Sequence, residues 1–213
     1  MFITLEGIEG SGKSTIINKL ADYLRDHDFL PLVTRQPGGS TLGRKLRPIL
    51  LDAASYDLAK EAELFLFLAD RAQHIQELIL PSLKEGQIVL CDRYSDSTLA
   101  YQGSGRQMDI EKLENICKLA SSDLKPDLTL LLDLPVRMGL GRALQRNCQQ
   151  GRDMNESRFD TESLDFHERV RQAYLRLAEK EPQRIKIINA ANRMEQVTRD
   201  CIAALKQKFA QLN

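Results

Sequence analysis

The residues with the clearest chemistry lie at positions 7–14, which read Gly-Ile-Glu-Gly-Ser-Gly-Lys-Ser. Two glycines, a lysine and a hydroxyl residue at this spacing are typical of a loop that binds nucleotide phosphates. The glycines let backbone N–H groups turn toward phosphate oxygens, and a helix that starts after the loop adds its partial positive charge. We expect Lys13 to reach the terminal phosphates and Ser14 to ligate Mg²⁺. The residues expected to contact the nucleotide are Gly7, Ile8, Glu9, Gly10, Ser11, Gly12, Lys13, Ser14 and Thr15.

Asp92 and Arg93 follow an apolar run at residues 88–91. Parallel strands bring their carboxyl ends to one edge of an open sheet, where ligands bind. Asp92 would hold the hydration shell of Mg²⁺ there, and Arg93 would face a substrate phosphate. The competing interpretation is a surface ion pair at a strand end, which is common in α/β proteins.

Two helix faces could hold a flat, partly polar ligand. Phe67 and Arg71 are four residues apart, so an aromatic ring lies beside a fork of donors on one helix. Thr98, Tyr101 and Gln102 share another face, where an amide and a hydroxyl could read the imide edge of a pyrimidine. The competing interpretations are a core position for Phe67, whose helix is apolar, and a solvated polar face for the other three.

The segment at residues 137–158 is rich in arginine and resembles a mobile basic flap. In phosphoryl transfer, Mg²⁺, a lysine and often an inserted arginine stabilise the migrating group, and a closing lid excludes water. The competing interpretation is an exposed polar loop whose charges have no specific role. The arginines of this segment are Arg137, Arg142, Arg146, Arg152 and Arg158.

Composition narrows the class of protein. The chain has 213 residues, of which 42% are hydrophobic and 28% charged, and this suits one α/β domain with a sizeable core. Thirty basic and thirty acidic side chains cancel, so we expect a small-molecule partner, with no nucleic acid and no membrane surface. We expect neither a leader peptide nor a membrane span, and hence a cytoplasmic protein. The four cysteines and three histidines are scattered, so neither disulfides nor a zinc site are expected.

Short apolar runs alternate with longer helical patterns, which predicts a parallel sheet with helices on both faces. The five expected strands are residues 2–5, 31–34, 88–91, 128–132 and 185–188. The expected helices are residues 13–26, 42–51, 59–84, 95–124 with an interruption near 103–105, 136–146, 162–178 and 194–211. Residues 36–40 should form a turn and residues 147–155 a loop. We expect one domain over residues 1–213, with a lid at approximately 146–160.

Taken together, these motifs resemble the thymidylate kinase family, and the resemblance covers essentially the whole chain. It depends on Glu6-Gly7 with Glu9 in the loop, and on the sequences at residues 34–39, 69–73, 92–94, 100–103 and 189–190. The resemblance implies the three-layer P-loop NTPase fold and transfer of a phosphoryl group from ATP to dTMP with Mg²⁺. It also implies a homodimer.

The resemblance also implies roles for single residues. Glu9 resembles the carboxylate near the deoxyribose 3′-hydroxyl, and Arg35 and Arg93 resemble ligands of the dTMP phosphate. Phe67 would stack under thymine, and Arg142 would lie against the donor adenine. The remaining residues implied for base and sugar are Arg71, which would hydrogen-bond the base, Thr98 and Gln102, the base-reading pair of the Gram-negative branch, and Tyr101, which would crowd the sugar 2′ position.

The P-loop has no basic residue at its variable positions, so the lid would supply the catalytic arginine, as in part of this family. Arg158 best matches the lid motif, with Arg152 second. The lid looks longer than the family pattern. A second departure is the turn Arg-Gln-Pro-Gly-Gly, where the family usually has Arg-Glu-Pro-Gly-Gly, so Gln36 lacks a carboxylate that could have helped around magnesium or Arg35.

We expect in-line transfer without a covalent intermediate, assisted by Lys13, Arg93, Arg152 and Arg158. The acceptor phosphate is ionised near neutral pH, so no strong general base is needed, and no histidine is expected in the site. Three alternative functions remain. A regulatory GTPase would need an Asn-Lys-x-Asp motif, and a non-catalytic scaffold would not need the lysine, acid and arginines seen here. A kinase of another nucleoside monophosphate or small acceptor would use the same mechanism, and only the face formed by Thr98, Tyr101 and Gln102 argues against it.

Overall fold

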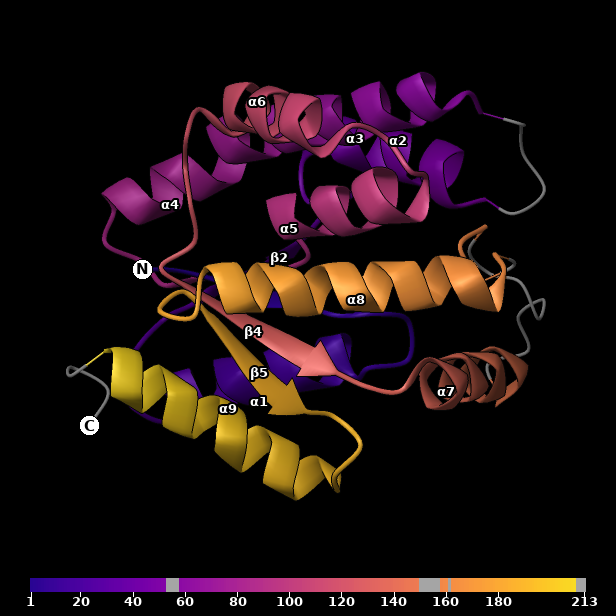
Figure 1. The fold of residues 1–213 in the computed structure, drawn as a ribbon. Helices are drawn as coiled ribbons and strands as arrows, with labels where there is room; N and C mark the ends of the chain where they lie inside the picture. The colour runs from indigo at the N-terminus through magenta and orange to yellow at the C-terminus, as the bar shows by residue number, and fades with distance from the viewer. Residues whose placement is uncertain (53–57, 150–157, 161, 210–213) are drawn as a thin grey trace.

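A five-stranded parallel sheet forms the centre of the protein (Figure 1). The computed structural model describes residues 1–52, 58–149, 158–160 and 162–209. The strands are β1 (Phe2–Glu6), β2 (Leu32–Arg35), β3 (Val89–Asp92), β4 (Leu128–Asp133) and β5 (Ile185–Asn189). They lie in the order β2-β3-β1-β4-β5, and every pair is parallel. The predicted fold class is confirmed, and each strand boundary lies within one residue of its predicted position.

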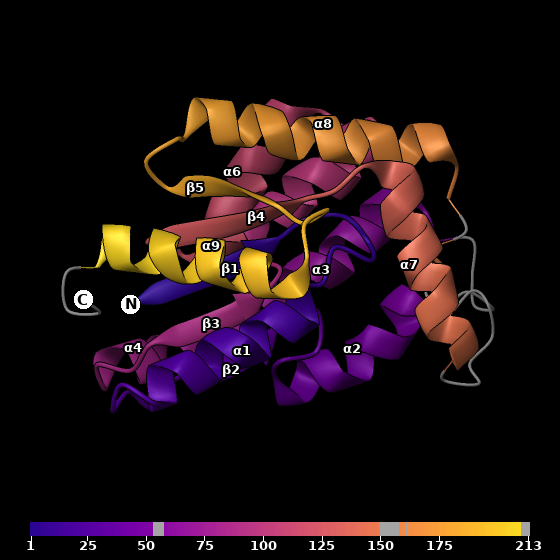
Figure 2. The same cartoon turned by 90° about the horizontal axis from the view of Figure 1, so that it is seen from below.

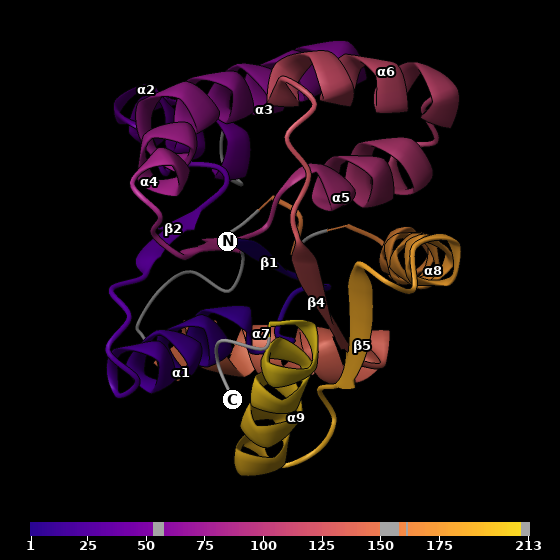
Figure 3. The same ribbon diagram turned by 90° about the vertical axis from the view of Figure 1, so that its left-hand side faces the viewer.

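Helices cover both faces of this sheet. The helical elements are α1 (Lys13–Arg25), α2 (Thr41–Leu51), α3 (Lys60–His74), η1 (Ile75–Ile79), α4 (Leu80–Lys84), α5 (Ser95–Thr98), η2 (Leu99–Gly105), α6 (Ile110–Ser121), α7 (Val136–Gln149), α8 (Leu164–Lys180) and α9 (Met194–Lys208). Helices α1 and α9 pack side by side on one face, which Figure 2 turns toward the viewer. Helices α3, α5, α6 and α8 lie on the other side, as Figure 3 shows. In the described part of the chain, no helix is long and apolar enough to cross a membrane.

Three helical predictions need correction. The segment at residues 60–84 is not one α-helix, because η1 inserts a π-helical turn into it. The helix after β3 is also π-helical over η2, and it breaks at residues 106–109 rather than near 103–105. Residues 147–149, expected in a loop, continue helix α7. A π-helical turn changes the angular spacing of side chains, and such turns occur frequently at functional sites.

The core explains why the strands were easy to recognise. All five residues of β1 are buried, and five of the six in β4 are buried as well. Strands covered on both faces read as nearly continuous apolar runs. Ile3, Leu5 and Leu130 pack in one cluster with Leu20 of α1 and Leu205 of α9. The sheet is therefore a rigid support for the loops at its carboxyl edge.

Candidate active site

A cleft of about 890 Å³ is lined by segments from several elements of the fold. It brings together most of the side chains that the sequence analysis selected. The lining includes Glu9, Gly10, Gly12, Lys13, Ser14, Thr15, Arg35, Phe67, Arg71, Asp92, Arg93, Thr98, Tyr101, Gln102 and Arg142. Gly7, Ile8, Ser11 and Arg158 do not line it, and Arg152 lies outside the described residues.

The phosphate-binding loop is shaped by its glycines. Gly7, Gly10 and Gly12 have φ angles of 139°, 67° and 90°, a region that favours glycine. A Cβ at Gly10 would also collide with the backbone carbonyl of Gly139 at the start of α7. The loop is thus packed against the helix that leads toward the predicted lid.

Lys13 folds back over this loop. Its Nζ donates hydrogen bonds to the carbonyls of Gly7 and Ile8, at 3.0 and 2.8 Å. Burial, reinforced by the nearby charge of Arg93, lowers the pKa of Lys13 to about 8. These carbonyls are neutral acceptors, so a phosphate would be a stronger partner for the ammonium group.

Ser14 and Asp92 meet across the start of α1 and the end of β3. Ser14 Oγ donates to Asp92 Oδ2 at 3.1 Å. The other carboxylate oxygen, Oδ1, is buried and has no hydrogen-bond partner in the structure. A hydroxyl and a carboxylate with spare acceptor capacity are oxygen ligands of the kind that Mg²⁺ prefers. The pair therefore fits a magnesium ion.

Arg93 lines the cleft beside Glu9 and makes several side-chain contacts there. Its Nη2 donates to Glu9 Oε1 and to the Tyr101 hydroxyl, both at 3.0 Å. Tyr101 in turn donates to Glu9 Oε1 at 2.6 Å. Arg93 has a φ angle of 69°, an unusual conformation for a non-glycine residue and one that the surrounding contacts must hold. The contacts with Glu9 and Tyr101 fix the position of the Arg93 guanidinium group.

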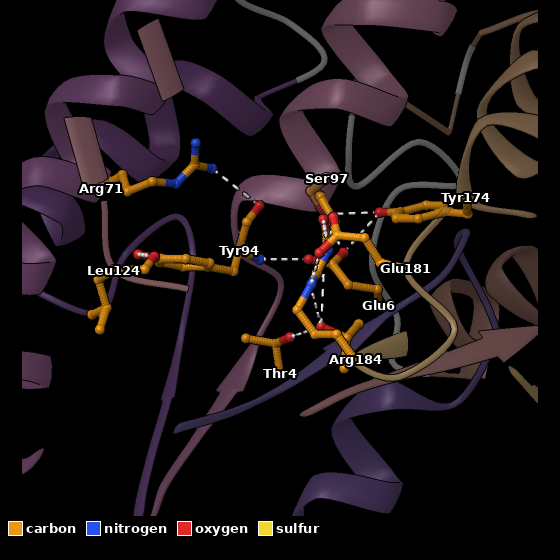
Figure 4. A network of polar contacts seen from close by, with 11 residues as sticks. Thr4, Glu6, Arg71, Tyr94, Ser97, Leu124, Tyr174, Glu181 and Arg184 are labelled. Carbon is orange, nitrogen blue, oxygen red and sulfur yellow. Dashed lines mark hydrogen bonds and ion pairs between the residues drawn. The ribbon is translucent and has the colours of Figure 1, made fainter. Parts of the chain in front are cut away.

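A second layer behind Arg93 was not predicted. Its Nη1 donates to Ser97 Oγ and to the Tyr174 hydroxyl, at 3.3 and 3.2 Å. Both hydroxyls donate to Glu6 Oε2, at 2.6 and 2.8 Å, while Glu6 Oε1 accepts from the Tyr94 backbone N–H (Figure 4). Glu6 therefore orients Arg93 through two hydroxyl groups. The sequence signal was an acidic residue at the end of an apolar strand.

The electrostatics of Glu6 differ from those of Glu9. Burial, and then repulsion from Asp96, raises the pKa of Glu6 to about 7. Asp96 itself pairs with both terminal nitrogens of Arg184, at 2.7 and 2.9 Å. Burial would also raise the pKa of Glu9, but the close approach of His167 and the charges of Arg93 and Lys13 lower it well below its usual range. Glu9 is therefore a permanent carboxylate at neutral pH.

Among the described residues no histidine lines the cleft, but one histidine lies directly behind Glu9. His167 is fully buried, and its Nδ1 lies 3.3 Å from Glu9 Oε2. His167 and Tyr174 are seven residues apart in α8, so they occupy the same face of that helix. This spacing was present in the sequence, but nothing local indicated that this helix face meets the phosphate-binding loop.

A second wall of the cleft is built around Arg71, which is only 2% exposed. Its Nη2 donates to Thr98 Oγ1 and to the Tyr94 carbonyl, at 2.9 and 3.1 Å, and its Nε donates to Gln36 Oε1 at 3.0 Å. The side-chain oxygen of Gln36 is thus held by Arg71. Gln36 Nε2 also lies 3.0 Å from His74 Nδ1. Gln36 therefore joins Arg71 to His74 behind the cleft.

Of the other predicted arginines, Arg142 lines the cleft and Arg158 does not. Arg142 Nη1 donates to the Ala190 carbonyl at 2.9 Å, beside the end of β5. Arg158 forms an ion pair with the buried Glu63. Arg47, which the sequence analysis did not select, lines the cleft and donates to the Pro37 carbonyl at 2.6 Å. Burial and the charge of Arg35 lower the pKa of Arg47, so two guanidinium groups flank this part of the cleft.

Comparisons with known proteins agree with this geometry. The family model described as thymidylate kinase matches residues 5–201. The thymidylate kinase of Desulfovibrio desulfuricans is 58% identical over 206 residues, covering 97% of this chain and 95% of that protein. That of Desulfosudis oleivorans is 48% identical over 207 residues, covering 97% of each. The crystal structure of thymidylate kinase from Ehrlichia chaffeensis superposes with a TM-score of 0.76 at 32% identity, covering 96% of this chain and 98% of that one. The chain belongs to the thymidylate kinase family.

Proposed function

We propose that the protein transfers the γ-phosphoryl group of ATP to dTMP and produces dTDP and ADP, a step in dTTP synthesis. Family membership over nearly the full chain supports this activity. The structural observation that carries the proposal is a single cleft lined both by the phosphate-binding loop and by Phe67, Arg71 and Gln102. Donor and acceptor nucleotides could meet there in one space.

On the donor side, residues 7–15 would bind the ATP phosphates and Arg142 would lie against the adenine. Lys13 would exchange the loop carbonyls that it now contacts for phosphate oxygens. Ser14 and Asp92 would hold Mg²⁺, consistent with the unpartnered buried oxygen of Asp92. When bound, the ion would neutralise charge on the phosphates and help to align them.

On the acceptor side, Arg35 and Arg93 would bind the dTMP phosphate and Glu9 would accept a hydrogen bond from the 3′-hydroxyl. Glu9 suits this role because its pKa lies well below the usual range, so it stays an acceptor. Phe67 would stack on thymine. The polar side chains assigned to base and sugar are Arg71, Thr98, Tyr101 and Gln102.

The reaction depends on the alignment of the two nucleotides and on stabilisation of the charge of the migrating phosphoryl group, more than on proton transfer. The acceptor phosphate is ionised near neutral pH, so no general base is required. Lys13, Arg93 and a lid arginine would stabilise the migrating group, which develops its charge distribution only in the transition state. Arg158 is the first candidate for the lid arginine and Arg152 the second. To act, Arg158 would have to exchange its present partner Glu63 for the phosphoryl group.

The test is ADP release in a coupled assay with ATP and Mg²⁺, run against dTMP, dUMP, UMP, CMP, AMP and GMP. We expect a strong preference for dTMP. Preference for another monophosphate would retain the kinase mechanism and refute the base-reading roles of Thr98, Tyr101 and Gln102. ATP turnover that is indifferent to every acceptor would refute kinase function.

Three further expectations belong to this proposal. We propose that residues 1–213 act as one kinase domain, with the lid at approximately 146–160. The family resemblance supports a homodimer and a cytoplasmic location. Sedimentation equilibrium of the purified protein tests the homodimer, and cell fractionation tests the cytoplasmic location.

A further inference from the structure

Glu63 is a buried carboxylate that does not line the cleft but contacts a residue that does. It lies in the first turns of α3 and is 1% exposed. Glu63 Oε1 accepts from Gln102 Nε2 at 2.7 Å and, more weakly, from Arg106 Nε at 3.4 Å. Its Oε2 accepts from Arg106 Nη2 at 3.2 Å and from Arg158. Two arginines thus balance the charge of this carboxylate, which can remain ionised although it is buried.

The contact with Glu63 fixes the orientation of the Gln102 amide. An ionised carboxylate accepts hydrogen bonds and cannot donate them, so the NH₂ group of Gln102 must face Glu63. The amide oxygen is then the branch that remains for another partner. Gln102 is itself 2% exposed and lines the cleft, so a ligand there would meet an acceptor rather than a donor.

The neighbouring donor completes a pattern that distinguishes pyrimidines. Arg71 also lines the cleft and carries only donors, and its Nη2 is held by Thr98 Oγ1 at 2.9 Å. A donor beside an acceptor complements a carbonyl beside a ring N–H, which is the imide edge of thymine or uracil. Cytosine presents an amino group beside an unprotonated ring nitrogen, so both of its groups would oppose this wall.

We propose that Glu63 is a positioning residue that sets the pyrimidine preference of the enzyme, by holding the Gln102 amide with its oxygen toward the substrate. This inference rests on the proposed function. Glu63 acts through Gln102 and does not contact the nucleotide. Without the carboxylate, the amide can rotate by 180° and present its NH₂ group, which suits the ring nitrogen of cytosine.

The test is the ratio of kcat/KM for dTMP to that for dCMP. The variant Glu63→Gln keeps the size of the side chain but can offer either a donor or an acceptor to Gln102. We expect the ratio to fall about tenfold, the scale of one hydrogen bond lost against a competing substrate. Glu63→Gln also removes the partner of Arg158, but a change in phosphoryl transfer affects both substrates and cancels in the ratio.

Glu162→Gln is the matched control. Glu162 pairs with Arg106, as Glu63 does, but no hydrogen bond between Glu162 and Gln102 is present in the described part of the chain. We expect this variant to keep the wild-type ratio. If Glu63→Gln does not fold, Glu63→Asp takes its place, because it keeps the charge and withdraws the carboxylate from Gln102. A melting temperature for each variant identifies folded protein.

An unchanged ratio in a folded Glu63 variant would overturn the proposal. An equal fall of the ratio in Glu162→Gln would also overturn it. Loss of either acidic partner of Arg106 would then have the same effect, and the contact with Gln102 would not be its cause. Wild-type protein that does not phosphorylate dTMP would refute the proposed function itself. The two failures are therefore distinguishable.

Discussion

Acidification should destabilise the protein through His74, because the hydrogen bonds around its ring require the neutral form. Arg71 donates to Gln36 Oε1, which turns the Gln36 NH₂ group toward His74 Nδ1. His74 Nδ1 must therefore accept, and Nε2 carries the proton that it donates to Thr34 Oγ1 at 2.7 Å. A protonated ring would place two donors face to face at Gln36.

Burial accordingly lowers the pKa of His74 to about 4 from its ordinary value of 6.5, with Arg71 opposing and Glu77 favouring protonation. The unfolded chain binds a proton below pH 6.5 and the folded protein does not. The free energy of unfolding therefore falls as the pH drops from about 6.5 toward 4. Between pH 7 and pH 5 the loss from this residue is about 2 kcal/mol.

Urea denaturation at pH 7, 6 and 5 measures this effect in the wild type and in His74→Gln. The variant loses hydrogen bonds at every pH, so only the pH-dependent difference is informative. We expect the stability gap between wild type and variant to narrow by about 2 kcal/mol from pH 7 to pH 5. A constant gap would refute the reasoning.

A second variant tests the cause. Gln36→Glu replaces the amide by a carboxylate, which can accept from both Arg71 and a protonated His74. The ring can then be charged in the folded protein, so the loss of stability between pH 7 and pH 5 should shrink. If Gln36→Glu has the same pH dependence as the wild type, the amide of Gln36 does not keep His74 neutral.

Three other predictions concern the cleft. Lys13→Ala should lower turnover by at least about a hundredfold with little change in melting temperature, and near-normal turnover would refute the phosphate-binding assignment. Arg158→Ala should lower kcat with little effect on the KM for dTMP, since the contact is needed chiefly in the transition state, and loss of activity in Arg152→Ala alone would reverse the lid assignment. Glu6 has a pKa raised to about 7, so its burial costs stability as the pH rises from 4.5 to 7, and denaturation of Glu6→Gln should lack that dependence.

Much of the fold could be predicted from the sequence because the central strands β1, β3 and β4 are buried almost throughout and the helices are amphipathic. The side chains that line the cleft were also accessible, because the loop motif and the strand ends place them at one edge of the sheet. The π-helical turns were not accessible. They depend on how the helices pack, and residues 99–105 carry no local pattern that separates a π-helix from an α-helix.

Two of the residues that the sequence analysis missed, Glu6 and Glu63, hold other side chains in place and do not line the cleft. Glu6 orients Arg93 through Ser97, and Glu63 orients Gln102. These partners come from different elements, and 91 residues separate Glu6 from Ser97, so no periodicity within one helix or strand connects them. One signal was still readable. Burying a carboxylate is costly unless donors surround it, so an acid that ends an apolar strand, as Glu6 does, predicts that polar side chains from distant segments converge on that position.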